Sequence, residues 1–183
     1  MQKKLRFLLL ALVFVLLLGG AYAGYRKLGS KLLPDSSAPA EMSEQFMDCT
    51  FYNAAGEPVA LSSLLGKPTL VNFWATWCPF CLEEFPELQK VFEDYGDRVN
   101  FVMVNDTDGV RETVETASSF LAETGYTFPV YFDRDSSAVS TYAVYNFPTT
   151  LFLAPDGALK FRYAGAMTYE MVAAQLDALL VQK

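Results

Sequence analysis

Two cysteines, Cys78 and Cys81, stand where an apolar stretch of the chain gives way to a segment with helical features. Residues 69–74 are almost continuously apolar, which is typical of a strand buried on both faces. Pro79 suits the first position of a helix, and residues 79–95 are predicted to form one that a glycine closes. The cysteine pair is therefore predicted to lie at the junction of a buried strand and a helix.

The rest of the sequence predicts an alternation of strands and helices around this junction. Strands are expected where short apolar runs occur, at residues 48–52, 58–61, 99–104, 128–132, 149–153 and 159–163. Further helices are expected at residues 110–124, 136–142 and 169–181. This order predicts an α/β fold with a central mixed β-sheet flanked by helices on both faces, and with an N-terminal β-hairpin made by the first two strands.

The predicted position of Cys78 favours a reactive thiolate. As the N-cap residue of the helix, it would face unpaired backbone N–H groups and the positive helix end, which stabilise a negative charge. Cys81 lies three residues further along the same face, close enough for a disulfide. The pair therefore predicts dithiol–disulfide exchange, in which Cys78 attacks a substrate disulfide and Cys81 resolves the mixed disulfide.

Other uses of a Cys-x-x-Cys pair fit the sequence less well. A zinc site needs more ligands, yet the chain has one other cysteine, Cys49, and no histidine. A purely structural disulfide would restrain the unfolded chain weakly, because the loop that it closes is short. The absence of histidine also excludes Cys-His and Ser-His nucleophilic pairs and C-x-x-C-H haem attachment. Residues 106–109 are interpreted as a strand-to-helix cap rather than a calcium loop, and no metal or cofactor is expected.

Charge is distributed unevenly along the chain. Six of the 14 basic residues precede Pro34, whereas all 21 acidic residues lie at or beyond Asp35. The eight remaining basic residues leave a formal charge of −13 from Asp35 onward. So acidic a domain is not expected to bind nucleic acid, and contact with a membrane is predicted for the basic N-terminal segment alone.

The N-terminus reads as a targeting or anchoring segment. Lys3, Lys4 and Arg6 precede an uncharged run at residues 7–25, whose 19 residues approach the ~20 that cross a bilayer. A retained anchor is the favoured interpretation. The sequence Ala21-Tyr22-Ala23 supplies the small-x-small pattern of a cleavage site, so a cleaved signal peptide is the alternative.

Residues 72–81 resemble the active-site stretch of thioredoxin-fold proteins, specifically the exported TlpA/ResA-like thiol–disulfide oxidoreductases. Pro86 corresponds to the proline that kinks the active-site helix of this fold. Residues 147–150, Phe-Pro-Thr-Thr, correspond to its cis-proline loop, whose backbone would pair with an extended substrate segment. The resemblance covers roughly Phe46 to the C-terminus and implies a thioredoxin-like fold for residues 46–183.

The resemblance also implies a set of functional residues. Cys78 and Cys81 would be catalytic, together with Glu84, whose match in the family is a carboxylate that raises thiol pKa values and relays a proton. The alternative for Glu84 is a solvated helix residue like its neighbour Glu83. Trp74 is a candidate for the border of a substrate groove, which the resemblance otherwise builds from Trp77, Pro79, Phe80, Phe147, Pro148 and Thr149.

Three positions leave questions open. Asn72 stands where thioredoxins proper carry a buried acid, so that acid is missing. Phe80 replaces the proline that is usual between the cysteines, which leaves the reduction potential undetermined. Cys49 is expected to be a buried, inert thiol, with an intermolecular or regulatory disulfide as the alternative.

The expected function is that of an extracytoplasmic protein disulfide oxidoreductase, with reduction favoured. Its partners would be disulfide-containing exported proteins, apocytochrome c among the candidates, and a membrane thiol–disulfide electron donor. The alternatives are a disulfide-forming oxidant and a redox-inert binding module that uses the groove around Pro148. A peroxide-reducing enzyme is disfavoured, because no P-x-x-x-T-x-x-C motif precedes Cys78.

The domain organisation follows from these expectations. Residues 1–28 are assigned to a signal peptide or transmembrane anchor, and residues 29–45 to a flexible tether rich in Ser, Pro, Ala and Gly. Residues 46–183 form the thioredoxin-like domain. The protein is expected on the extracytoplasmic side of the bacterial cell membrane, anchored by residues 7–25, or secreted if the signal is cleaved.

Overall fold

The structure is a computed structural model that describes residues 46–181. These residues form one mixed sheet with the strand order β2-β1-β5-β4-β3-β6-β7. The strands are β1 (Thr50–Tyr52), β2 (Pro58–Ala60), β3 (Thr69–Trp74), β4 (Asn100–Asn105), β5 (Val130–Phe132), β6 (Thr149–Leu153) and β7 (Leu159–Ala164). The helices are η1, a 3-10 helix (Leu61–Leu64), α2 (Pro79–Tyr95), α3 (Val114–Thr124), α4 (Ser137–Thr141) and α5 (Tyr169–Val181). The predicted α/β class, central mixed sheet and N-terminal hairpin are confirmed.

Strand β3 lies inside the sheet and carries the active-site end of the fold. It pairs in parallel with β4, with Trp74 opposite Asn105, and antiparallel with β6. The parallel β3–β4 and β4–β5 pairs are joined by crossovers that contain α2 and α3, as parallel strands require. The carboxyl ends of β3 and β4 therefore meet at one edge of the sheet, where α2 begins.

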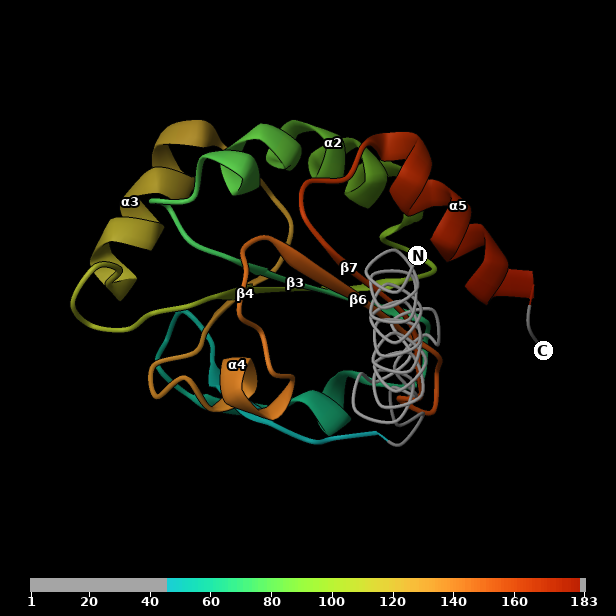
Figure 1. Ribbon diagram of the computed structural model, residues 1–183, viewed down its shortest axis with the longest axis horizontal. Coiled ribbons are helices and arrows are strands. Elements are labelled where there is room, and N and C mark those ends of the chain that lie inside the picture. The colour runs from blue at the N-terminus through green and yellow to red at the C-terminus, as the bar shows by residue number, and fades with distance from the viewer. Residues whose placement is uncertain (1–45, 182–183) are drawn as a thin grey trace, which may run out of the picture. The chain divides into compact units, whose positions relative to one another are not determined.

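Side chains alternate between the two faces of the sheet and build a core on each. From β3, Leu70 and Trp74 pack into the core shared with α2, α3 and α5, whereas Val71 and Phe73 face the core shared with α4 and η1. Figure 1 shows α2, α3 and α5 over one face and α4 over the other. Asn72 has the parity of Leu70 and Trp74, so its side chain points toward α2.

Helix α3 begins later than predicted. The expected start at residue 110 is wrong, because the Asp108 carboxylate accepts hydrogen bonds from the backbone N–H groups of residues 110–112 at 2.7–3.0 Å and holds them in a turn. The helix starts only after Thr113, whose hydroxyl caps the N–H of Thr116 at 3.1 Å. Residues 106–109, interpreted as a strand-to-helix cap, lie between β4 and α3, but the residue that caps α3 is Thr113.

Membrane attachment concerns residues outside the described part of the chain. Within residues 46–181, no helix has the length and apolarity needed to cross a bilayer. The predicted anchor or signal at residues 1–28 and the tether at residues 29–45 both lie outside the described residues.

Candidate active site

The two cysteines of the motif form a disulfide at the start of α2. Their Cα atoms are 5.3 Å apart. Cys78 is the N-cap residue, as predicted, and its sulfur accepts the backbone N–H of Cys81 at 3.2 Å. Pro79 occupies the first helical position, where its missing N–H costs nothing. The sulfur of Cys78 therefore faces the electropositive end of a 17-residue helix.

The disulfide is shielded while the residues around it are exposed. Cys78 is 3% exposed and Cys81 is fully buried, whereas Phe80 between them is 62% exposed. Trp77 is half-buried, but Trp74 is completely buried in the core. Trp74 therefore does not border a groove, and that expectation is wrong, because the last residue of β3 still points into the core under α2.

The loop before β6 reaches the cysteine motif through an aromatic contact. The Phe147–Pro148 peptide bond is cis, and the Phe147 ring meets the Trp77 ring edge-on at 5.7 Å between centroids. The Pro148 carbonyl accepts the backbone N–H of Gly165 at 2.8 Å, which ties the loop to the end of β7. The sequence segment predicted as a cis-proline loop thus lies beside the start of α2.

Glu84 is buried beneath the active-site end of α2, unlike its exposed neighbour Glu83. One carboxylate oxygen accepts the side-chain N–H of Asn72 at 2.7 Å, and the other accepts the backbone N–H of Met167 at 3.0 Å. Asn72 also donates to the Thr150 hydroxyl at 3.0 Å. Burial raises the pKa of the Glu84 carboxyl to about 7, because desolvation outweighs the lowering by these two hydrogen bonds.

This raised pKa makes the stability of the fold depend on pH. The folded-state pKa of Glu84 lies above the ordinary value of 4.5, so the protonated side chain contributes to the free energy of unfolding. That contribution is fully present below pH 4.5 and is lost as the pH rises through about 7. We expect Glu84→Gln to remove this dependence and to be more stable than the wild type at pH 8, by up to roughly 3 kcal/mol. Urea unfolding at pH 5 and pH 8 measures the difference.

The control for this prediction is Glu83→Gln, which changes the same charge at an exposed position one residue away. The side-chain amide of the new glutamine can still be hydrogen-bonded. The Asn72 Oδ1 atom has no hydrogen-bond partner among the described residues, and it can accept from the glutamine N–H once the Asn72 side-chain amide rotates by half a turn. A Glu84→Gln protein whose stability falls with pH as steeply as that of the wild type would contradict the prediction.

Two functional candidates next to the motif were missed in the sequence. Glu112 is fully buried and accepts the Thr76 hydroxyl at 2.6 Å, the Thr76 backbone N–H at 3.2 Å and the Asn105 amide at 2.8 Å. The Arg111 guanidinium lies 3.8 Å from the centroid of the Trp77 ring. No local pattern distinguishes these residues from solvated loop charges, since their partners in the active-site loop, Thr76 and Trp77, lie more than 30 residues away.

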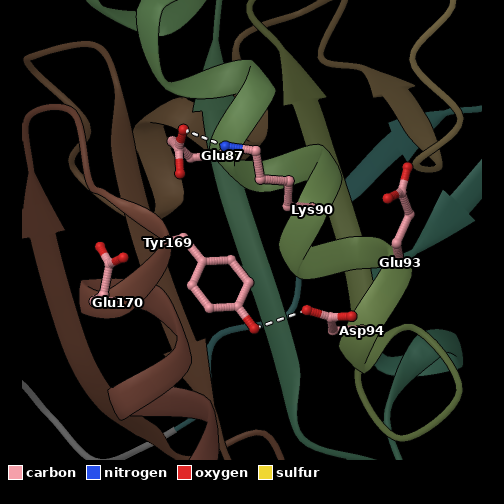
Figure 2. A pocket seen from close by; sticks show the side chains of 6 residues that line it. All are labelled: Glu87, Lys90, Glu93, Asp94, Tyr169 and Glu170. Carbon is pink, nitrogen blue, oxygen red and sulfur yellow. Dashed lines mark hydrogen bonds and ion pairs between the residues drawn. The ribbon is translucent and has the colours of Figure 1, made fainter.

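Two cavities lie side by side between α2 and the start of α5. A cavity of about 540 Å³ has walls that include Glu83, Glu84 and Met167. An adjoining cavity of about 450 Å³ lies further along α2 and is shown in Figure 2, where Tyr169 donates to Asp94 at 2.7 Å. Neither cavity is lined by Cys78 or Cys81. The first touches the active site only through Glu84.

The third cysteine is separate from this site. Cys49 precedes β1, is 8% exposed and is not in a disulfide. Burial, with the nearby carboxylates of Asp133 and Asp48, raises the pKa of its thiol to about 12. Within residues 46–181, no group of three or more acidic or cysteine side chains is arranged to hold a metal ion.

Comparisons with known proteins agree with this geometry. Residues 42–162 match the AhpC/TSA family. The chain is 29% identical over 174 residues to the thiol–disulfide oxidoreductase ResA of Halalkalibacterium halodurans, covering 94% of each. It is 31% identical over 134 residues to the thioredoxin-like protein YneN of Bacillus subtilis, covering 73% of this chain and 78% of the relative. The pneumococcal exposed lipoprotein thioredoxin of Streptococcus pneumoniae superposes with a TM-score of 0.64 at 26% identity, over 73% of this chain and all of that one.

Proposed function

Because the chain belongs to the AhpC/TSA family, and within it to the thioredoxin-like thiol–disulfide oxidoreductases, we propose that it reduces disulfides of exported proteins outside the cytoplasm. The observation that carries the proposal is the Cys78–Cys81 disulfide at the N-terminus of α2, beside a cis-proline loop.

In the proposed reaction, the reduced protein acts through Cys78. Its thiolate attacks one sulfur of a substrate disulfide, which breaks that bond, forms a mixed disulfide and releases the first substrate thiol. The Cys81 thiolate then attacks the Cys78 sulfur, closes the internal disulfide and releases the second substrate thiol. Two electrons and two protons pass to the substrate, and a thiol donor must reduce Cys78–Cys81 again.

Glu84 is the residue that we propose to handle the proton of Cys81. Glu84 lies three positions after Cys81 on α2, so both side chains lie on the same helix face, and both are buried. A carboxyl with a pKa of about 7 exchanges protons readily near neutral pH, whereas an ordinary glutamate is almost always ionised there. Thioredoxins proper carry a buried acid on the strand, at the position that Asn72 occupies here. In this proposal Glu84, on α2, takes over the role of that acid.

The proposed substrate groove crosses the disulfide between two loops. In this proposal Trp77, Pro79 and Phe80 form one side, and Phe147, Pro148 and Thr149 form the other; because the Thr149 side chain is fully buried, Thr149 can offer the groove only its backbone. The exposure of Phe80 and the contact between Trp77 and Phe147 support an apolar, partly aromatic surface for an extended polypeptide. Apocytochrome c is a candidate substrate, since it must present reduced cysteines to haem.

For the location of the protein, we propose the extracytoplasmic side of a bacterial membrane, with residues 7–25 as the anchor. A basic start followed by an uncharged run of 19 residues is typical of an export signal or anchor and supports the proposal, whereas the three basic residues on each side of the run leave its orientation undecided by charge. A membrane protein that carries a thiol–disulfide pair would be the electron donor. Secretion after signal cleavage is the alternative.

The reduction potential of the Cys78–Cys81 pair tests the direction of the reaction. We expect a value of about −270 mV or lower, as for thioredoxin, in glutathione or dithiothreitol buffers, with a Cys49→Ser background to leave one titrating pair. A value near −120 mV would make the protein an oxidant and exclude the reductase role. A pair that does not titrate would favour the redox-inert binding module instead.

A further inference from the structure

The segment before α3 is attached to the active-site loop at two successive residues. Arg111 contacts Trp77 and Glu112 contacts Thr76, so adjacent residues of one segment hold adjacent residues of the other. Asp108 fixes the segment from within through its backbone hydrogen bonds. The roles proposed above for Cys78, Cys81 and Glu84 do not account for either contact.

Glu112 is built into this attachment as a buried carboxylate. It is fully buried, and both of its oxygens accept hydrogen bonds from Thr76. A third bond comes from Asn105 at the end of β4, the residue that pairs with Trp74 in the sheet. A buried carboxylate is costly unless each oxygen is satisfied, so its presence fixes the Thr76 backbone within a narrow range of positions.

Arg111 forms the outer layer of the same attachment. Its guanidinium lies 3.8 Å above the Trp77 ring, which itself meets Phe147 edge-on at 5.7 Å. The side chains of Arg111, Trp77 and Phe147 thus form a row of contacts that connects the segment before α3, the active-site loop and the cis-proline loop. A cation over an indole face is attracted to the negative face of the ring, so this contact restrains the Trp77 side chain.

The charge of Arg111 is unusual for this region. The segments that meet around the disulfide are residues 75–87, 105–113, 144–150 and 165–170, the last held by hydrogen bonds from Met167 to Glu84 and from Gly165 to Pro148, and Arg111 is the only basic residue among them. Their acidic residues are Glu83, Glu84, Glu87, Asp106, Asp108, Glu112 and Glu170, while residues 144–150 carry no charge. Arg111 therefore places a positive charge over the residue that precedes Cys78, in otherwise acidic surroundings.

We propose that Arg111 and Glu112 are positioning residues for the exchange reaction: Glu112 fixes the loop that presents Cys78, and Arg111 holds Trp77 against the substrate groove and favours the Cys78 thiolate. This inference rests on the proposed role of Cys78 as the attacking thiol. It adds to that role a second source of thiolate stabilisation, besides the N-terminus of α2.

The test of Arg111 is the pH dependence of Cys78 alkylation in the full-length reduced chain, kept in detergent, on a Cys49→Ser background. We expect Arg111→Gln to raise the pKa of the Cys78 thiol by roughly half a pH unit and to slow alkylation at pH 7 about threefold. Arg111→Lys should recover much of this shift. Arg98→Gln is the matched control, since Arg98 also lies over a ring, that of Tyr95 at 4.9 Å, at the far end of α2.

The test of Glu112 uses its partner Thr76. Thr76→Val removes the hydroxyl bond and Thr76→Ser keeps it, so we expect the valine variant to lose several-fold in the rate of insulin reduction but little with a small aromatic disulfide. Equal rates for the two variants would overturn the positioning role of Glu112. If the pH dependence of Cys78 alkylation is the same in Arg111→Gln as in the wild type, the positioning role of Arg111 is overturned. In both cases Cys78→Ser must be inactive; an active Cys78→Ser would instead refute the proposed function itself.

Discussion

Replacing Cys81 with serine stops the reaction halfway, so the Cys81→Ser variant accumulates a covalent adduct with its substrate and loses nearly all turnover. Cys78 retains its place at the N-terminus of α2 and still attacks a disulfide, but no internal thiol remains to release the product. We expect a loss of roughly a thousandfold in steady-state reduction of insulin. Non-reducing electrophoresis should show an adduct that dithiothreitol removes.

Cys78→Ser is the partner variant for this experiment. It should form no adduct, because the remaining thiol at Cys81 lies inside α2, fully buried, and lacks the N-cap position that favours a thiolate at Cys78. If Cys78→Ser forms the adduct and Cys81→Ser does not, the two roles are reversed. If both variants still turn over, the Cys78–Cys81 pair does not carry the reaction.

The second large effect concerns the support beneath the active-site helix. We expect Phe85→Ala to destabilise the fold by about 3–5 kcal/mol, a large part of the stability of an ordinary domain. Phe85 is fully buried, and its ring meets four aromatic rings at centroid distances of 4.9–5.9 Å, those of Trp74, Phe120, Tyr126 and Phe128. Its removal leaves a cavity between α2 and the sheet.

Urea or thermal unfolding measures this effect, with Phe80→Ala as the control. Phe80 is on the same helix, but it is 62% exposed, so its truncation should change stability by less than about 1 kcal/mol. Similar losses for the two variants would show that the aromatic cluster around Phe85 does not support α2 as its packing indicates. Phe80→Ala should instead lower the affinity for polypeptide substrates.

Local signals were sufficient to predict the architecture and the redox pair. The apolar run at residues 69–74, Pro79 at the first helical position and the glycines after α2 and α3 define elements through short-range chemistry. The Cys78 N-cap follows from the same chemistry. The start of α3 was predicted four residues too early. Asp108 and Thr113 are both good capping residues, and the sequence does not show that Asp108 binds the backbone N–H groups of a turn that includes Glu112, while Thr113 caps the helix.

The parts that could not be predicted depend on contacts between distant residues. Glu83 and Glu84 are indistinguishable in sequence, yet Glu84 is buried because Met167 and Asn72, 83 and 12 residues away, supply its hydrogen-bond donors. Glu112 owes its burial to Thr76, 36 residues away. Trp74 was expected at a groove together with Trp77 and Phe80, the other aromatic residues of the motif, but strand parity turns its side chain into the core.

The state of Cys49 bears on how faithfully this protein handles disulfides. A chain with three thiols can in principle close three different internal disulfides, or couple to a second molecule, each time it meets an oxidised partner. With a thiol pKa of about 12, Cys49 is a thiolate in on the order of one molecule in ten thousand at pH 8, and its side chain is almost inaccessible. In the folded protein Cys49 is therefore a very slow partner in thiol–disulfide exchange, so its burial disfavours scrambling with the Cys78–Cys81 pair.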